Sequence, residues 1–301
     1  MVFVEKIKIK GKEYYRLLHT IRQKNKIMHK MKYLGKSIPP KARLEQLKKE
    51  FLKEIHGQKY TYLSEKDIEK ITEKKEEHLK EIKSLSLSQK EKNLEEFIIR
   101  FTYDSSKLAG VNVTLRQTSL ILKEGILPKD IKELRTVKEL ENHEKGILAI
   151  TKYKGALNEH FIKKIHKILL VGVDDEIAGK FRHELKKNVK LTGTPYVPPN
   201  WQNLMKELDA FFKWYSSENR KLHPIELASL LHLKIISIQP FIDGNSRLSR
   251  LLMNWILWKK GFPLVNIPVE DLENYYKALD KYQIEKNEKP FIVYIKQRFL
   301  Q

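Results

Sequence analysis

Two strongly apolar stretches separated by a short polar loop constrain the fold of this chain more than any other feature. Residues 224–238 and 247–260 carry apolar side chains around so much of a helical surface that both are predicted to be buried helices. The residues between them, 239–246, read QPFIDGNS and are therefore held by the core of a helical domain. With 41% hydrophobic residues, the 301-residue chain can build such a core.

Helical periodicity over much of the remaining chain predicts a mainly α-helical protein. Apolar residues recur at three- to four-residue spacing over about 41–170, over 201–217, over 270–282 and from Pro290 onward. Residues 186–199, KKNVKLTGTPYVPP, interrupt the pattern, because a glycine and three prolines forbid a helix while the residues around them suit short strands. The sequence therefore predicts a β-hairpin flap at this point.

The N-terminal segment differs from the rest in both pattern and charge. Residues 2–34 alternate apolar and charged side chains at a period of two, which predicts a small β-meander. Residues 1–36 contain eleven Lys and Arg against two Glu, a net charge of +9 within the +21 of the whole chain. We therefore expect three parts: a small basic β-sheet segment over 1–40, a helical connector over 41–93 and a helical domain over 94–301.

Composition excludes several kinds of site. The chain has no cysteine, which rules out disulfides, thiolate metal sites and a cysteine nucleophile. No apolar run is long enough for a membrane helix, and the first residues lack the apolar stretch of a signal peptide. These features predict a cytoplasmic protein without a membrane partner. The positive net charge favours polyanionic partners, although Lys and Glu alternate over most of the chain, as expected of a merely soluble surface.

The loop between the two apolar helices has the composition of an anion site. Gly244 lets the backbone approach a ligand, Asn245 tolerates a left-handed turn, and Asp243 offers a carboxylate to Mg²⁺. Arg247 and Arg250 lie three residues apart on one helical face, where two guanidinium groups can grip adjacent phosphates. The alternative is an ordinary turn whose arginines form surface salt bridges, and it does not explain why the loop lies between two buried helices.

At these residues the chain resembles the Fic family, whose signature runs HPF-x-D/E-GNGR-x-x-R. Two positions depart from it: Gln239 stands in place of the family histidine, and Ser246 in place of the second glycine. The matching residues are Pro240, Phe241, Asp243, Gly244, Asn245, Arg247 and Arg250.

Further similarities surround the loop. Residues 179–182 (GKFR) resemble the Gly-x-aromatic-Arg element of the family, and residues 103–115 resemble its self-inhibitory helix, with the motif Ser/Thr-x-x-x-Glu-Gly/Asn. Ser105 and Gly110 fit that motif, but Ala109 occupies the position of the inhibitory glutamate. The resemblance identifies the substrate-positioning flap with the segment that contains Leu191, Thr192, Gly193 and Tyr196.

The resemblance implies a Fic-type helical bundle and the transfer of AMP from ATP to a Ser, Thr or Tyr hydroxyl on a target protein. It implies ATP and Mg²⁺ as ligands, with the metal on Asp243. Gln239 would stand at the position of the catalytic base, and Asn245 and Arg247 would complete the catalytic set. The nucleotide would be held by Gly244, Asn245, Ser246, Arg247 and Arg250, the last of these at the γ-phosphate.

The substitution at position 239 leaves the enzymatic activity open. A glutamine amide is not a useful base near neutral pH, and general-base assistance contributes about 10²–10⁴-fold, so transfer is expected to be weak or lost while ATP binding persists. The neighbouring histidines His183 and His232 are weak candidates for a replacement base. The substitution at 109 is expected to leave ATP binding unblocked.

Three functions remain in competition at this stage. The first is an atypical adenylyltransferase, and the second is a non-catalytic Fic pseudoenzyme that acts as a binding or regulatory module. The third is a nucleic-acid-associated regulator that contacts phosphates through residues 1–36. The alternative interpretation of this segment is a solvated sheet whose lysines prevent aggregation. A kinase-like role is less favoured, because such loops carry lysine where Ser246 stands. The target protein and the oligomeric state, a homo-oligomer included, are left open.

Overall fold

The computed structural model describes residues 2–9, 11–23, 26–56 and 62–301, with the side chains at 21–28, 49 and 52–56 left aside. The chain divides into two compact units. The first comprises Met1–Lys59 with Arg220–Leu222, and the second comprises Tyr60–Asn219 with His223–Gln301. The three-part division expected from the sequence, with boundaries at residues 40 and 93, stays a prediction.

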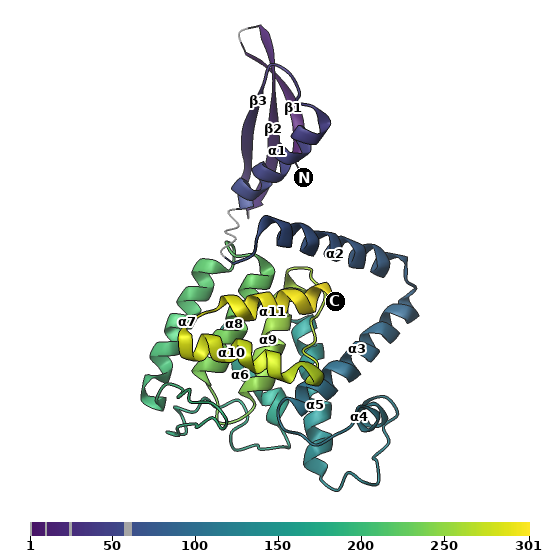
Figure 1. Cartoon of the computed structure of the whole chain (residues 1–301), viewed down its shortest axis with the longest axis vertical. Helices are drawn as coiled ribbons and strands as arrows, with labels where there is room; N and C mark the ends of the chain where they lie inside the picture. The colour runs from purple at the N-terminus through teal and green to yellow at the C-terminus, as the bar shows by residue number, and fades with distance from the viewer. Residues whose placement is uncertain (1, 10, 24–25, 57–61) are drawn as a thin grey trace. The chain divides into compact units, whose positions relative to one another are not determined.

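The first unit contains the small β-meander and one helix (Figure 1). Strands β1 (Val2–Ile9), β2 (Lys12–Gln23) and β3 (Lys26–Gly35) form an antiparallel sheet in the order β1-β2-β3, and α1 spans Lys41–His56. The Leu17 side chain on the central strand is fully buried, as is nearly all of Phe51 on the helix. The strands and helix predicted from periodicity are confirmed.

The second unit is helical, and its core surrounds α8 and α9. Figure 1 shows these two helices in the middle of the unit, with α10 and α11 to one side. Helix α9 also contacts α5 and α6, and α8 contacts α7. The helices are α2 (Glu65–Ser84), α3 (Leu87–Lys107), α4 (Leu115–Leu122), α5 (Leu134–Lys152), α6 (Glu159–Leu170), α7 (Leu204–Glu218), α8 (Pro224–Ile238), α9 (Asn245–Lys259), α10 (Leu272–Glu285) and α11 (Lys289–Leu300), with short 3₁₀ turns at Trp201–Asn203 and Val269–Asp271.

Local sequence explains where several of these helices begin. Ser64, Ser86 and Thr114 each accept a hydrogen bond from a backbone N–H in the first turn, in reciprocal capping boxes at the starts of α2, α3 and α4. Helix α8 begins with proline at its first position, where the missing N–H costs nothing. Its Glu226 carboxylate accepts hydrogen bonds from the backbone N–H groups of Tyr62 and Leu63, which fixes the start of the second unit onto the core.

One detail of the expected fold is wrong. The segment 186–199 was predicted to form a β-hairpin, but its residues form bends and irregular backbone with no strand pairing. The prolines at 195, 198 and 199 lack the N–H groups that a ladder needs, and the segment is held through side chains instead. Tyr196 donates its hydroxyl to the carbonyl of Ser237, 3.0 Å away, and Thr194 donates to Asp280 at 3.3 Å.

Within the described part of the chain, no helix is both long and apolar enough to span a membrane.

Candidate functional site

The loop between α8 and α9 makes two left-handed turns. Gln239 ends α8 with φ of +50°, and Gly244 precedes α9 with φ of +77°. A Cβ atom added at Gly244 would lie 2.9 Å from Cδ2 of Leu170 and 3.2 Å from Nε2 of His166. Position 244 therefore requires glycine both for its backbone conformation and for its close approach to α6.

Asn245 holds the loop closed. Its side-chain oxygen accepts from the backbone N–H of Phe241 at 3.0 Å, and its amide nitrogen donates to the carbonyl of the same residue at 2.9 Å. The fully buried Phe241 ring stacks on His166 with ring centroids 3.6 Å apart. These contacts position the loop, and the catalytic role predicted for Asn245 stays a prediction.

His166 on α6 is the main loop-holding residue that the sequence did not reveal. Its Nδ1 accepts from the backbone N–H of Gly179, and its Nε2 lies 2.9 Å from the carbonyl oxygen of Asp243, so the ring is neutral with its proton on Nε2. Burial lowers the pKa of His166 to about 4. The only signal in the sequence is one polar residue on the apolar face of α6, a pattern too common to single it out.

Arg182 fixes the end of α8 from the opposite side. Its guanidinium is fully buried and donates from Nε to the carbonyl of Gln239 at 2.7 Å, and from Nη2 to the carbonyls of Pro199 and Ile238. Its backbone N–H donates to the carbonyl of Pro240. A cation at a helix C-terminus stabilises the unsatisfied carbonyls there, which explains the arginine of the GKFR element.

The buried histidines predict that the protein loses stability in acid. His166 and His223 have pKa values lowered to about 4 by burial, so between about pH 6.5 and pH 4 the unfolded chain binds protons that the folded chain does not. The free energy of unfolding should therefore fall as the pH falls through this window, by on the order of 3 kcal/mol for His166 alone. Thermal unfolding followed by circular dichroism at a series of pH values measures this effect.

The matched variant for this prediction is His166→Gln, whose amide can still donate to Asp243 and accept from Gly179. It should show a shallower loss of Tm between pH 6.5 and pH 4 than the unchanged chain. An equal slope in the two proteins would contradict the assignment of His166.

Arg247 and Asp243 face a cavity of about 670 Å³. The Arg247 side chain is only 3% exposed, yet its Nε and Nη1 atoms have no hydrogen-bond acceptor among the described residues. Nη1 lies 3.4 Å from Oε1 of Glu139 and Nη2 lies 3.7 Å from Oδ2 of Asp243, which are ion-pair distances and not hydrogen bonds. The cavity is lined by Ala109, Gly110, Val111, Asn112, Thr114, Gln117, Asp130, Ile131, Lys132, Glu133, Arg135, Thr136, Glu139, Asp243 and Arg247.

The N-terminus of helix α9 follows Asp243 closely along the chain, although the cavity lining includes none of residues 244–246. Helix α9 begins at Asn245, and no described side chain caps its N-terminus, so the N–H groups of its first turn stay available to an anion. Arg135 brings a second guanidinium, with Nη2 4.0 Å from Oδ2 of Asp243. A buried arginine and an exposed arginine thus flank one carboxylate just before the start of helix α9.

Arg250 does not line this cavity. It is fully buried and donates from Nε to Oγ of Ser105 at 2.9 Å, from Nη2 to the Ser105 carbonyl at 2.7 Å, and from Nη1 to Oγ of Ser246 at 2.6 Å. Arg250 is thus held by Ser246, which replaces the second glycine of the family signature, and by Ser105, which fits the inhibitory-helix motif. Its assignment as a phosphate ligand stays a prediction, and it requires these bonds to be exchanged.

Gln239 is 6% exposed, and its Nε2 donates to the carbonyl of Ile236 at 2.7 Å. None of the chain's described histidines lines the cavity. His232 is fully buried, lies 3.1 Å from the Tyr275 hydroxyl and stacks on Phe291, while burial lowers its pKa. His183 also lies outside the cavity lining, so neither histidine considered from the sequence is placed as a replacement base.

The remaining predicted residues fall into two places. Ala109 and Gly110 line the cavity, whereas Ser105 lies beneath it with its side chain on Arg250. In the segment predicted as the flap, Gly193 has φ of +82°, and a Cβ atom added there would meet no other atom within 4 Å. Tyr196 lies beside α8, because its hydroxyl donates to the carbonyl of Ser237. Leu191 and Thr192 belong to the irregular stretch before it, and the cavity lining does not include them.

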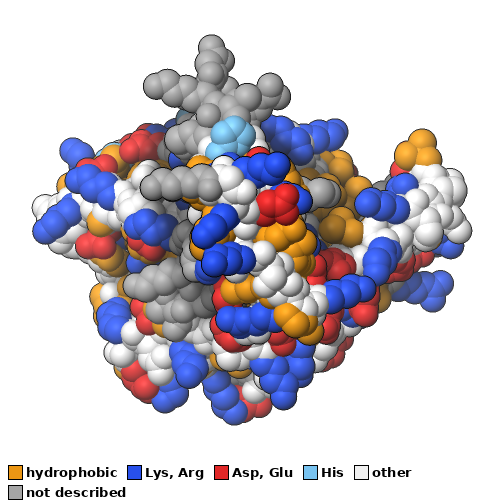
Figure 2. All heavy atoms as spheres, turned by 90° about the horizontal axis from the view of Figure 1, so that it is seen from above, with side chains coloured by type: hydrophobic (Ala, Val, Ile, Leu, Met, Phe, Trp, Pro, Cys, Tyr) orange, Lys and Arg blue, Asp and Glu red, His pale blue; other side chains and the backbone are white. Residues whose placement is uncertain are grey.

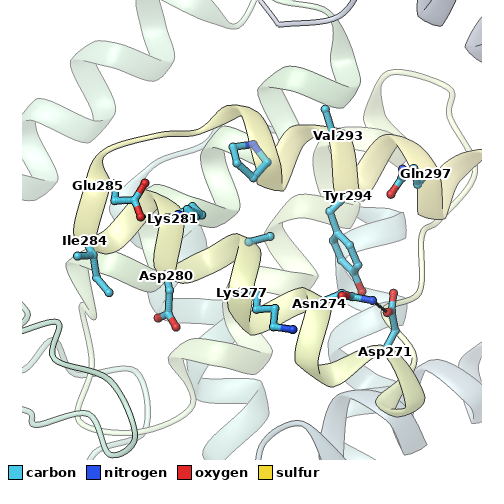
Figure 3. A pocket seen from close by; sticks show the side chains of 12 residues that line it. Asp271, Asn274, Lys277, Asp280, Lys281, Ile284, Glu285, Val293, Tyr294 and Gln297 are labelled. Carbon is cyan, nitrogen blue, oxygen red and sulfur yellow. Dashed lines mark hydrogen bonds and ion pairs between the residues drawn. The ribbon is translucent and has the colours of Figure 1, made fainter.

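A separate cavity of about 680 Å³ lies between α10 and α11 (Figure 3). Tyr294 points toward Asn274 and Asp271 at one end, and Asp280, Lys281 and Glu285 lie toward the other. None of the residues predicted for the site lies here. Its lining combines apolar side chains such as Ile284 and Val293 with carboxylates and lysines, and it contains no arginine.

Comparison with known proteins agrees with this geometry. The model of the Fic/DOC family matches residues 156–257, which contain the whole loop. The chain is 32% identical over 241 residues to a protein adenylyltransferase Fic from Nematostella vectensis and 35% identical over 196 residues to one from Drosophila yakuba. These matches cover 79% and 64% of this chain.

Solved structures show the same fold. A Fic domain containing signaling protein from Bacteroides thetaiotaomicron superposes with a TM-score of 0.68 at 26% identity, over 78% of this chain and 92% of that protein. Fic-1 from C. elegans superposes with a TM-score of 0.66 at 22% identity, over 87% of this chain and 75% of that one, which supports the fold alone.

The matched region spans only 55% of the Nematostella protein and 38% of the Drosophila one. The comparisons therefore show a shared domain, and they do not show that this chain has the whole activity of those proteins. The domain match, the shared helical fold and the loop at residues 239–250 agree with one another: this chain belongs to the Fic/DOC family, with its Fic domain at residues 156–257.

Proposed function

We propose that the cavity at Arg247 binds a nucleoside triphosphate with Mg²⁺, and that the chain is a protein adenylyltransferase whose transfer step is weak or lost. The observation that carries this proposal is Arg247 itself. A guanidinium buried to 3% exposure, two of whose nitrogens have no acceptor among the described residues, is costly unless a ligand supplies one. Phosphate oxygens match its fork geometry.

The residues present fit a magnesium ion held jointly with the nucleotide. Oδ1 of Asp243 accepts from the backbone N–H of Gly244 at 2.6 Å, whereas Oδ2 lies at ion-pair distances of 3.7 Å from Arg247 and 4.0 Å from Arg135. No cluster of three metal-ligating side chains occurs in the described ranges, and Mg²⁺ commonly takes one protein carboxylate with phosphate oxygens and water. The metal would neutralise charge on the phosphates.

The reaction joins a target hydroxyl to the α-phosphorus of ATP. The hydroxyl oxygen forms the new O–P bond, the bond between the α-phosphorus and its bridging oxygen breaks, and pyrophosphate leaves with that electron pair. Arg247 and the first-turn N–H groups of α9 would stabilise the phosphate charge. The hydroxyl proton must pass to a base, and in this chain position 239 offers an amide in place of an imidazole.

The second candidate function is a non-catalytic nucleotide-binding module. It is favoured by Gln239, whose Nε2 is occupied by the Ile236 carbonyl, and by the lack of any described histidine in the cavity lining. Both candidates need the same phosphate cradle, and they differ only in whether a bond to phosphorus is made. A target protein presenting a hydroxyl at the flap follows from the first candidate alone.

Two measurements on the full chain test the proposal and separate the candidates. Isothermal titration with ATP, with and without Mg²⁺, should show binding that weakens when the metal is chelated. Incubation with α-labelled ATP should then show slow self-labelling for the transferase and none for the binding module. A chain that binds no ATP at millimolar concentration would overturn both candidates.

A glutamate at position 109 should weaken this binding. Ala109 and Arg247 line the same cavity, so a carboxylate introduced at 109 would compete with the phosphates for the guanidinium and repel their charge. Removing one charge-assisted contact predicts a roughly tenfold higher Kd for ATP in Ala109→Glu. Ala109→Gln is the matched control, because it has the same size without the charge. Equal affinities of the two variants would show that bulk and not charge is responsible.

A further inference from the structure

The first unit exposes an apolar and aromatic face that the nucleotide site does not explain. The strand register places Leu18 between Phe3 and Met31, Ile7 opposite Tyr14, and Arg16 opposite Tyr33. Because side chains alternate across a strand, these residues share one side of the sheet. We call this side the aromatic face. Its apolar and aromatic members are Phe3, Ile7, Ile9, Tyr14, Leu18, Met31 and Tyr33, and its charged members are Glu5, Lys12 and Arg16.

Much of this face is open to solvent. The exposed fraction is 46% for Phe3, 52% for Met31 and 58% for Tyr33. The rings of Tyr14 and Tyr33 lie 5.6 Å apart at an angle of 43°, which leaves the outer surface of Tyr33 uncovered. A sheet whose only task is to stay soluble carries polar residues on its open side, so large exposed apolar side chains on a three-stranded sheet indicate a binding surface.

The charge of the same segment indicates what binds there. Residues 1–59 hold 17 Lys and Arg against 5 Asp and Glu, which is +12 of the net +21 within about a fifth of the chain. Elsewhere along the sequence Lys and Arg alternate with Asp and Glu. Figure 2 shows side chains of both charge types spread over the face that it draws. A concentration of positive charge on one small unit favours a polyanion.

Cations lie along both sides of the sheet. Lys12 pairs across from Ile9 and so belongs to the aromatic face, as does Arg16, whose Nε donates to Glu5 at 2.6 Å. Lys8 and Lys30, both exposed, lie on the opposite side of the edge strands. On the aromatic face itself, a chain of phosphates would meet the exposed Lys12 and the guanidinium of Arg16 beside Glu5.

We propose that the aromatic face binds single-stranded nucleic acid, with bases stacked on Tyr33 and Phe3 and phosphates near the surrounding lysines. Every base offers a π-face to an aromatic ring, and a single strand leaves those faces accessible. A duplex hides them in the base stack, and an acidic protein offers negative charge without a regular series of planar rings. This surface is independent of the cavity at Arg247.

Fluorescence anisotropy of a labelled oligothymidine or oligouridine, titrated with the full chain without ATP, tests the proposal. The affinity should fall steeply as salt is raised, because phosphate contacts release counterions. Tyr33→Ala and Phe3→Ala should each weaken binding by about 5- to 150-fold, and Tyr33→Phe should keep it. Lys12→Gln should lower affinity for every sequence alike and reduce the salt dependence.

Three outcomes would overturn the proposal. The first is the absence of single-strand binding at low salt. The second is duplex DNA or an acidic polypeptide binding as tightly as the single strand, with Tyr33→Ala without effect, which would leave only a cationic surface. The third is loss of oligonucleotide binding in Arg247→Gln, which would place the interaction at the nucleotide cavity and not at the sheet.

Discussion

Replacing Gln239 with histidine is expected to raise AMP transfer by about 10²–10⁴-fold, the usual contribution of a general base. Two features of position 239 suit an imidazole side chain. Its left-handed backbone, with φ of +50°, is one that histidine adopts more readily than most residues. The Ile236 carbonyl that now accepts from the glutamine Nε2 could accept from Nδ1–H of the imidazole, which would leave Nε2 as the proton acceptor.

The readout is self-labelling with α-labelled ATP together with release of pyrophosphate, measured on the full chain. Gln239→Asn is the matched control, because asparagine tolerates the left-handed turn and keeps an amide but offers no base. The rate in Gln239→His should rise with pH as the imidazole loses its proton. Gln239→His could also bind ATP like the unchanged chain and still transfer no AMP. That result would indicate a binding module in which the missing transfer is not caused by residue 239 alone.

The sequence predicted the elements that hold the site because they are set by local patterns. The apolar stretches at 224–238 and 247–260 became α8 and α9, and the period-two alternation at the N-terminus became three strands. Both patterns indicate which faces of a single element are buried, and they can be recognised without knowing which other elements pack against it. The glycine at 244 was predicted for the same kind of reason, since its positive φ is a local property.

The sequence did not predict the contacts between segments that lie far apart along the chain. His166 and Arg182 come from segments far from the loop in sequence, and their roles arise only when α6 and the 179–182 turn pack beside it. The burial of Arg250 is a similar case. Three residues apart on a helix, Arg247 and Arg250 were expected to act together, but α3 brings Ser105 to the second one alone. Long-range packing decided which arginine faces the cavity.

Removing the charge of Arg247 should markedly weaken nucleotide binding. In Arg247→Gln the phosphates of a bound nucleotide would lose the guanidinium, and a hydrogen bond to a charged group contributes about 1.5–3 kcal/mol. Since 1.4 kcal/mol is a factor of ten, the Kd for ATP with Mg²⁺ should rise by roughly 10- to 150-fold. Isothermal titration measures this change, and circular dichroism reports whether the fold is retained.

The stability of this variant must be separated from its affinity, because Glu139 loses its buried partner. Oε1 of Glu139 lies 3.4 Å from Nη1 of Arg247 and 3.6 Å from Nε of Arg135, so only the exposed arginine would remain beside it. The double variant Arg247→Gln with Glu139→Gln removes the unpaired carboxylate and should recover the Tm that the single variant loses. It should not recover ATP binding. A double variant that recovers both would show that Arg247 supports the helix packing and that the phosphates bind elsewhere.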